Sequence, residues 1–282
     1  MDHAALRAKA DTLRRLHHGP AILVLPNAWD VASARIVEEA GYPAIATTSA
    51  GVAFALGYPD GERISRDEML EAVGRIASRV RVPVTADLEA GYGPEPADTA
   101  ETIRRAIEVG VVGANIEDGT HRREQPLCSM NLAVARIAAA RKAADAADVP
   151  FVINARTDSY LAARLFGGPA DERCFEETVR RGRAYRDAGA DCIFVPGLAD
   201  REIIRRLVQD IGGPINILAG PDSPPVPELQ ALGVARVSMG GMVMRATLGL
   251  VRRAAAELRA AGTFGFADGA VGHSDMNKAL GE

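Results

Sequence analysis

Residues 107–116 read Ile-Glu-Val-Gly-Val-Val-Gly-Ala-Asn-Ile, and this stretch contains the unit that repeats along the chain. A helical segment ends in glycine and passes directly into a short apolar strand. The same change recurs in residues 38–46 (EEAGYPAIA), 186–195 (RDAGADCIFV) and 230–239 (QALGVARVSM). Glycine is favoured just after a helix because it adopts the left-handed backbone without steric cost. The repeat therefore predicts alternating helices and strands.

Eight short apolar segments, in most of which Val or Ile is prominent, are predicted strands. They lack sustained polar alternation, which is typical of strands buried on both faces. The predicted strands are 21–25, 44–48, 82–86, 114–116, 151–154, 192–195, 215–218 and 235–239. The helices predicted between them include 30–40, 66–79, 97–109, 132–147, 172–188 and 201–210. Eight strands in this alternation favour an α/β fold of the (β/α)8 TIM-barrel type.

A doubly wound sheet is the second candidate fold. It is disfavoured because residues 23–34 (LVLPNAWDVASA), at the first strand-to-helix turn, lack the GxGxxG pattern. No low-complexity linker or change in composition divides the chain. We therefore expect residues 1–262 to form a single barrel domain that includes an N-terminal helix. The Gly-rich residues 263–282 are expected to form a C-terminal tail or an oligomer contact.

Composition excludes several classes of protein. The 282 residues include 33 basic and 37 acidic side chains, so no positive excess points to nucleic acid. No apolar run approaches the ~18 residues of a membrane span. The absence of an apolar signal segment in residues 1–19, and three cysteines without CxxC, favour a cytoplasmic location. With only three lysines, none placed near a predicted strand end, imine chemistry is disfavoured.

Acidic side chains follow two neighbouring predicted strands, where barrel enzymes carry their reactive groups. Asp87 and Glu89 stand two residues apart, so we expect both to face the barrel mouth, and Glu117 follows the next strand. Three converging carboxylates repel one another unless a cation neutralises them. Oxygen ligands without a Cys or His among them select Mg²⁺ or Mn²⁺. The sequence therefore predicts a metal site of Asp87, Glu89 and Glu117.

Each of these candidate residues also has a structural interpretation. The acids could pair with the many arginines, and Arg156, which suits a substrate carboxylate or phosphonate, could instead bridge them. Ser49, Ala50 and Gly51 could form an oxyanion pocket or merely a tight turn. Asp118 is interpreted as a loop or cap residue. His121 is interpreted as a solvated loop histidine, and Cys192 as a small apolar residue of the core.

Five motifs in this order and spacing resemble the isocitrate lyase/phosphoenolpyruvate mutase family. They are TSAG (48–51), GYPD (57–60), ADLEAGYG (86–93), NIEDG (115–119) and NARTD (154–158). The resemblance implies a (β/α)8 barrel whose eighth helix is swapped between subunits in a dimer of dimers. It also implies Mg²⁺, a small α-keto or α-hydroxy acid as substrate, and an enolate-like species next to the carbonyl.

The resemblance assigns roles by position. Asp87 matches the acid that contacts the metal directly, whereas Glu89, where the family usually has Asp, and Glu117 would act through water. Arg156 matches the substrate-binding arginine, and Asp60 an acid near the metal and the entrance. Substrate contacts are implied for Ser49, Ala50 and Gly51, and approximately for Asn216.

The chain departs from the family pattern after the IED motif. Lyases of the family carry Lys-Lys/Arg-Cys-Gly-His there, but residues 119–130 read GTHRREQPLCSM. Cys128 lies too late in this segment and lacks the flanking residues. The lysine and polar gating residue of the mutases are replaced by Gly119, Thr120 and His121, and the strand-six glutamate of the lyases by the region of Pro196.

The expected activity is therefore Mg²⁺-dependent C–C cleavage or decarboxylation of a small α-keto or α-hydroxy (di)carboxylic acid. The proton donor is left open between water, His121 and Tyr92. Two alternatives remain: a phosphonate mutase or P–C hydrolase, and a non-catalytic barrel that binds a small acid.

Overall fold

Residues 2–281 of the chain are described by a computed structural model. In this part of the chain nine strands form one sheet in which all neighbours are parallel. Their order around the sheet is β1 (Leu23–Leu25), β9 (Arg236–Ser238), β8 (Ile215–Leu218), β7 (Cys192–Val195), β6 (Val152–Arg156), β5 (Gly113–Glu117), β4 (Val84–Asp87), β3 (Ile45–Thr47) and β2 (Asn27–Ala28).

β1 and β2, the strands at the two ends of this order, are consecutive in the chain, so the sheet curves round into a nearly closed barrel. β1 pairs with β9, whereas β2 pairs with β3. Pro26 separates β1 from β2 and has no N–H to donate, so the ladder breaks there. The predicted (β/α)8 barrel is confirmed, and seven predicted strands match β3 to β9 closely. β2 was not predicted because two residues beside a proline form no apolar run.

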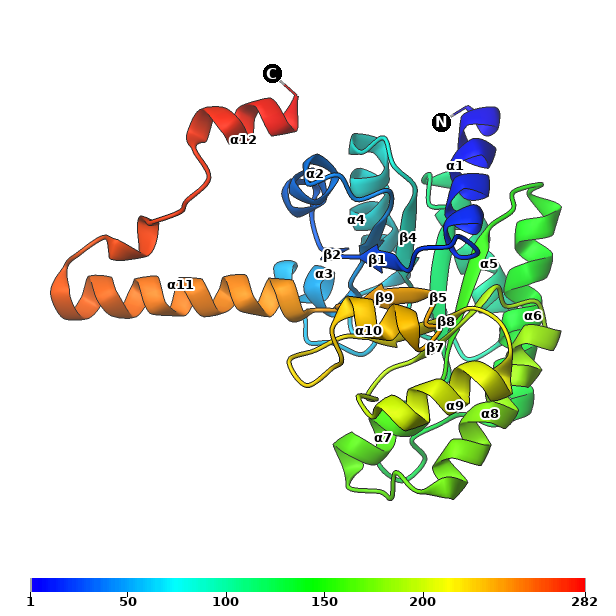
Figure 1. The fold of residues 1–282 in the computed structure, drawn as a ribbon. Coiled ribbons are helices and arrows are strands. Elements are labelled where there is room, and N and C mark those ends of the chain that lie inside the picture. The colour runs from blue at the N-terminus through cyan, green and yellow to red at the C-terminus, as the bar shows by residue number, and fades with distance from the viewer. Residues whose placement is uncertain (1, 282) are drawn as a thin grey trace.

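Helices cover the outside of the barrel (Figure 1). The helices within residues 2–281 are α1 (His3–Leu16), α2 (Val31–Glu39), α3 (Ser49–Ala55), α4 (Arg66–Arg79), α5 (Pro96–Glu108), α6 (Met130–Ala146), α7 (Ser159–Phe166), α8 (Glu172–Asp187), α9 (Arg201–Ile211), α10 (Val226–Ala231), α11 (Met242–Ala261) and α12 (His273–Leu280), with the 3-10 turn η1 (Gly265–Ala267). α3 and α7 are too short to show periodicity in the sequence.

The repeated glycines end helices, as the sequence predicts. Gly41, Gly110, Gly189 and Gly233 all have positive φ, between 85° and 106°, directly after the last residue of α2, α5, α8 and α10 and its C-cap. A side chain would strain the backbone in this region. These turns direct each chain segment back into the next strand of the barrel.

α1 covers the amino ends of the strands. It buries Leu6, Ala10 and Leu13, and a Cβ on Gly113 at the start of β5 would lie only 2.8 Å from Leu13 Cδ2. At its C-cap, His17 is 3% exposed, and its Nε2 lies 3.5 Å from a guanidinium nitrogen of the fully buried Arg236 in β9. The reactive side chains must therefore lie at the opposite, carboxyl end of the strands.

α11 projects from the barrel, and the chain then turns back so that α12 contacts α2 (Figure 1). Met244 is the one residue of α11 that is fully buried, while five large apolar side chains of this helix are exposed: Val243, Leu248, Leu250, Val251 and Leu258. Within residues 263–281, the chain forms η1 and α12. None of the helices between residues 2 and 281 has the length and apolar content needed to cross a bilayer.

Candidate active site

Asp87, Glu89 and Glu117 come together at the carboxyl ends of β4 and β5. Asp87 is the last residue of β4 and Glu117 the last of β5, while Glu89 lies beyond its strand and has a φ of 50°. The expected strand alternation therefore does not place Glu89. A left-handed turn of the backbone brings its carboxylate to the other two acids instead, and all three side chains are at least 92% buried.

Asp87 is held by three hydrogen bonds. Ser49 donates its backbone N–H and its hydroxyl to Oδ2, at 3.2 and 2.8 Å, and Asn115 Nδ2 donates to Oδ1 at 3.2 Å. Ser49 is the first residue of α3, which begins directly after β3. The tight-turn interpretation of residues 49–51 is thus replaced by the start of a helix. Its Gly51 amide donates to Thr48, whereas the Ala50 amide has no acceptor within residues 2–281.

Glu89 sits among other acids in a buried position. Burial and the neighbouring carboxylates of Glu117 and Asp87 raise its pKa to about 8. Its carboxylate accepts the Glu62 amide at 2.5 Å and the Tyr92 hydroxyl at 3.2 Å. The site therefore concentrates more negative charge than its donors neutralise.

Glu117 lies between a histidine and an arginine. Its Oε2 pairs with Arg156 at 2.7 Å, and His121 Nε2 lies 3.2 Å from Oε1. Burial raises the pKa of Glu117 although the Arg156 guanidinium opposes this, and the nearby Glu117 carboxylate raises the pKa of His121 to about 9. Glu117 Oε1 is nevertheless buried without a donor of hydrogen-bond geometry in the described chain.

Arg156 ends β6 and bridges two acids. Besides Glu117, it pairs with Asp158 through Nε at 2.6 Å and a terminal nitrogen at 3.0 Å, and it lies over the ring of Phe194. Arg156 thus bridges two carboxylates, which is the structural interpretation considered from the sequence. The same guanidinium also faces the acid cluster, where it can meet an anionic substrate.

These residues fit a divalent cation. One oxygen each of Glu89 and Glu117 and one nitrogen of His121 lie within 4.8 Å of one another, and Glu117 Oε1 is buried without a hydrogen-bond donor in the described chain. Carboxylate oxygens in such number suit Mg²⁺ or Mn²⁺. Asp87 lies outside this group of three because Ser49 and Asn115 hold its carboxylate, although its charge raises the pKa of Glu89.

Two further candidates have different positions. Burial and the nearby Asp87 raise the pKa of Asp60, so this loop carboxyl faces the acid cluster. Asn216 is fully buried in β8 and exchanges hydrogen bonds with Ser238 of β9. The structure does not join Asn216 to the acids.

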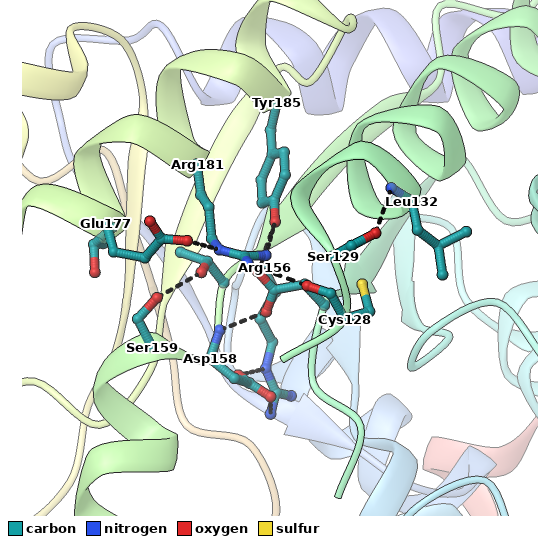
Figure 2. A network of polar contacts seen from close by, with 12 residues as sticks. Cys128, Ser129, Leu132, Arg156, Asp158, Ser159, Glu177, Arg181 and Tyr185 are labelled. Atoms are coloured by element: carbon teal, nitrogen blue, oxygen red, sulfur yellow. Dashed lines mark hydrogen bonds and ion pairs between the residues drawn. The ribbon is translucent and has the colours of Figure 1, made fainter. Parts of the chain in front are cut away.

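Asp118 is not an ordinary loop or cap residue, which corrects the sequence interpretation. Its carboxylate is 1% exposed and accepts bonds from Arg181 at 3.0 Å, Tyr185 at 2.6 Å and the Asp158 amide at 2.9 Å. Figure 2 shows Arg181 between Glu177, Tyr185 and the carbonyl of Cys128. α8 therefore supplies a buried cation for Asp118, which itself accepts the backbone amide of Asp158, the partner of Arg156.

The segment after Glu117 is fixed at both ends. At its start, a Cβ on Gly119 would lie 2.3 Å from Asp158 Oδ2, so only glycine fits. At its end, the Cys128 amide donates to Asp118 O at 2.8 Å, and Arg181 donates to Cys128 O at 3.1 Å. Burial raises the pKa of the Cys128 thiol. Cys128 holds the segment in place through its backbone amide and carbonyl. Cys192 is buried in β7, as expected of a core residue.

Sequence reasoning missed several residues that position the site. Glu62 accepts the amides of Ala90 and Tyr92 and so shapes the turn that carries Glu89. Asn154 donates to Asn115 at 2.7 Å, behind Asp87. Asn115 and Asn154 could have been noticed as polar side chains within otherwise apolar strands. No sequence pattern marks Glu62.

The chain has relatives over most of its length. Residues 13–259 match the family model described as phosphoenolpyruvate phosphomutase. An uncharacterised protein of Mycobacterium tuberculosis is 36% identical over 233 residues, which are 83% of each chain. The 2,3-dimethylmalate lyase of Eubacterium barkeri is 30% identical over 235 residues, covering 79% of this chain and 77% of the lyase.

Solved structures show the same fold. A Burkholderia cenocepacia J2315 protein classed as a lyase/mutase matches with a TM-score of 0.91 and 42% identity, covering 99% of this chain and 98% of that one. Oxaloacetate acetylhydrolase with its product oxalate gives 0.84 and 29%, over 97% and 94%. Phosphonopyruvate hydrolase with oxalate and Mg²⁺ gives 0.83 and 27%, over 97% and 95%. The chain belongs to the phosphoenolpyruvate phosphomutase family, as a lyase-like enzyme of that family.

Proposed function

We propose that the chain is a Mg²⁺-dependent enzyme that cleaves a C–C bond, or decarboxylates, next to the carbonyl of a small α-keto or α-hydroxy (di)carboxylic acid. The observation that carries the proposal is the convergence of Asp87, Glu89 and Glu117 in a buried site that leaves Glu117 Oε1 without a donor. Two of the solved relatives hold oxalate, one of them together with Mg²⁺. Mn²⁺ satisfies the same oxygen ligands.

Each proposed residue has a separate task. Glu89 and Glu117 would hold the cation, with Asp87 and Asp60 beside them. Bound Mg²⁺ would supply a Lewis acid that lowers the energy of an enolate-like species. Arg156 and the free Ala50 amide would bind the substrate carboxylate, with Ser49 and Gly51 completing the wall.

Two groups are placed to move a proton. His121 lies 3.2 Å from Glu117, and the Tyr92 hydroxyl lies 3.2 Å from Glu89. The buried Cys128 thiol is turned to the core, so the acid/base thiol of family lyases has no counterpart there. We propose His121 as the proton donor, because it is half exposed and its Nε2 lies beside the carboxylate of Glu117. Asn216 is left out of this site.

A phosphonate mutase or P–C hydrolase is the second candidate. Its support is the phosphonopyruvate hydrolase relative and an arginine that suits phosphonate as well as carboxylate. A panel of oxaloacetate, 2-methylisocitrate and phosphonopyruvate, assayed with Mg²⁺ for pyruvate release, separates the two. A third reading, a barrel that only binds an acid, predicts binding without turnover of any of them.

The proposal is tested by calorimetry with oxalate, which mimics the enolate of pyruvate. Oxalate should bind in the presence of Mg²⁺ and not after chelation. Asp87→Ala should abolish metal-dependent turnover and weaken oxalate binding at least tenfold, because a carboxylate beside the proposed cation is lost. Asp210→Asn, an exposed acid on α9, serves as the control. Full activity in excess chelator would reject the proposal.

Assembly and location extend the proposal. We propose that residues 1–262 form one barrel domain and that the exposed apolar face of α11 packs on another copy of the chain. Swapped helices in a dimer of dimers would cover this face, with residues 263–282 as a tail at the contact. The cysteine usage supports a cytoplasmic location.

A further inference from the structure

Arg236 is a buried cation inside the barrel, and it forms no ion pair with an acid of residues 2–281. It is the first residue of β9, is 1% exposed, and its Nε has no hydrogen-bond partner in the described chain. Burial lowers its pKa to about 10, although the charge of Asp87 opposes this, so the guanidinium remains charged at neutral pH. Burying an unpaired charge is costly. The side chain therefore calls for a role that an apolar core residue could not fill.

The side chain of Arg236 crosses the barrel interior from β9 to β5. One terminal nitrogen lies 3.5 Å from Nε2 of His17, below the strands. The contact of 2.8 Å between His17 Nδ1 and Leu13 O assigns the ring proton to Nδ1, which leaves Nε2 as an acceptor. The other terminal nitrogen lies 3.5 Å from Oδ1 of Asn115 on β5. The guanidinium is thus placed between α1 and the strand that carries Glu117.

Asn115 lies between Arg236 and Asp87. Its Oδ1 faces the guanidinium and also accepts a hydrogen bond from Asn154 Nδ2 at 2.7 Å. Its Nδ2 donates to Asp87 Oδ1 at 3.2 Å. The carbonyl end of the amide therefore points toward the cation and the amino end toward the anion. In a buried environment this orientation of the amide dipole is favourable at both ends.

The hydrogen bond between the two asparagines does not by itself select this orientation. Asn154 Oδ1 is buried without a donor in the described chain. If both amides turned over, Asn115 Nδ2 could donate to that oxygen, and the pair would keep one hydrogen bond. Asn115 would then turn its oxygen toward Asp87 and its amino group toward Arg236, and both contacts would be repulsive. The two charges therefore select the direction of the amide.

We infer that Arg236 is a positioning residue, whose charge fixes the Asn115 amide so that it donates to Asp87 and holds this carboxylate beside the proposed cation site. Ser49 holds the other oxygen of Asp87, so Asn115 supplies the donor that fixes Oδ1. Arg236 acts only through Asn115. The inference rests on the proposed function, because it requires that Asp87 serves a bound cation.

The test measures oxalate binding in Mg²⁺ by calorimetry. Arg236→Met fills a similar volume without the charge and should weaken binding about fivefold. Asn115→Leu removes the donor to Asp87 and should weaken binding by at least as much. The double variant should bind oxalate like Asn115→Leu alone, because the effect of Arg236 passes through Asn115. Cys192→Ala, another substitution of a buried residue of the barrel, should leave oxalate binding unchanged.

Urea unfolding without Mg²⁺ separates positioning from support of the fold. Arg236→Met should unfold at no lower urea concentration than the unaltered chain, because an apolar side chain of similar size replaces an unpaired buried charge. Arg236→Gln keeps a polar end without the charge, and it carries the binding test if the methionine variant does not fold. A lower unfolding concentration together with unchanged oxalate binding would assign Arg236 to the fold alone and overturn the inference.

The failure of the inference and that of the proposed function are distinct. If the unaltered protein does not bind oxalate with Mg²⁺, the proposed function fails, and the role of Arg236 falls with it. If the unaltered protein binds oxalate and both Arg236 variants bind it as tightly, the positioning role alone is overturned. The same holds if the losses of the two single variants multiply in the double variant, since Arg236 would then act independently of Asn115.

Discussion

At the scale of single residues, the buried Asp118–Arg181 pair shows how an acid outside the proposed metal site can position the residues of that site. Asp118 receives the Arg181 guanidinium, the Tyr185 hydroxyl and the Asp158 amide. Removing one member of a buried pair leaves the other charge without compensation, which costs more than the pair itself contributes. Asp118 therefore matters through Asp158 and Arg156, although it touches neither proposed metal nor substrate.

We expect Asp118→Asn to lower the free energy of unfolding by about 3 kcal/mol. The reason is that Arg181, 6% exposed, loses the more deeply buried of its two anionic partners. Urea unfolding followed by circular dichroism measures the change. Glu177→Gln, which removes the more exposed partner of Arg181, is the matched control and should cost less. An Asp118→Asn chain as stable as the control would show that the pair contributes no stability.

At the scale of elements, α1 closes the amino end of the barrel with a histidine that must stay neutral. Burial and the nearby Arg236 together lower the pKa of His17 to about 3. In the unfolded chain the ordinary value is 6.5. Between these two values the unfolded chain binds a proton that the folded chain does not, so stability falls as the pH decreases.

His17→Gln should therefore flatten the pH dependence of stability on the acidic side. Near pH 5 the neutral buried histidine costs about 2 kcal/mol relative to neutral pH, and glutamine does not titrate. Chemical unfolding of both chains at several pH values measures this difference. His18→Gln, at the exposed neighbouring position, should keep the acidic loss. Parallel stability curves for the unaltered and His17→Gln chains would contradict the assignment.

Elements also show what the sequence could predict. Glycine follows four of the helices because the backbone there has a positive φ. The sequence therefore correctly predicted four helix ends, at Gly41, Gly110, Gly189 and Gly233. The acids at the ends of β4 and β5 followed from strand order alone. Glu62, in contrast, reaches Glu89 and Tyr92 from 27 to 30 residues away, and Arg181 reaches Asp118 from another helix. Such contacts depend on tertiary packing, which no local pattern encodes.

At the scale of the whole molecule, α11 is the feature that an isolated chain leaves unexplained. A helix of 20 residues with five exposed large apolar side chains presents more apolar surface than a monomer usually tolerates. An exposed apolar face of this kind is typical of a protein–protein contact. The proposed assembly would bury this face.

Val251→Glu should reduce the size of the assembly in sedimentation, because Val251, 62% exposed in the single chain, would place a charge in the proposed contact. Ser78→Glu, an exposed residue of α4, adds the same charge elsewhere and should leave the assembly unchanged. A Val251→Glu chain that sediments like the unaltered protein would place the interface elsewhere.

The double anchoring of the segment between Gly119 and Cys128 has a consequence for how such enzymes diversify. Gly119 at its start packs against Asp158, and Cys128 at its end bonds to Asp118 and Arg181, so both ends of the segment are fixed. His121, the proposed proton donor, lies near the start of this segment and stays beside Glu117. Residues 122–127 hold none of the proposed catalytic groups, so substitutions there can change substrate specificity while the anchored ends and His121 keep the chemistry.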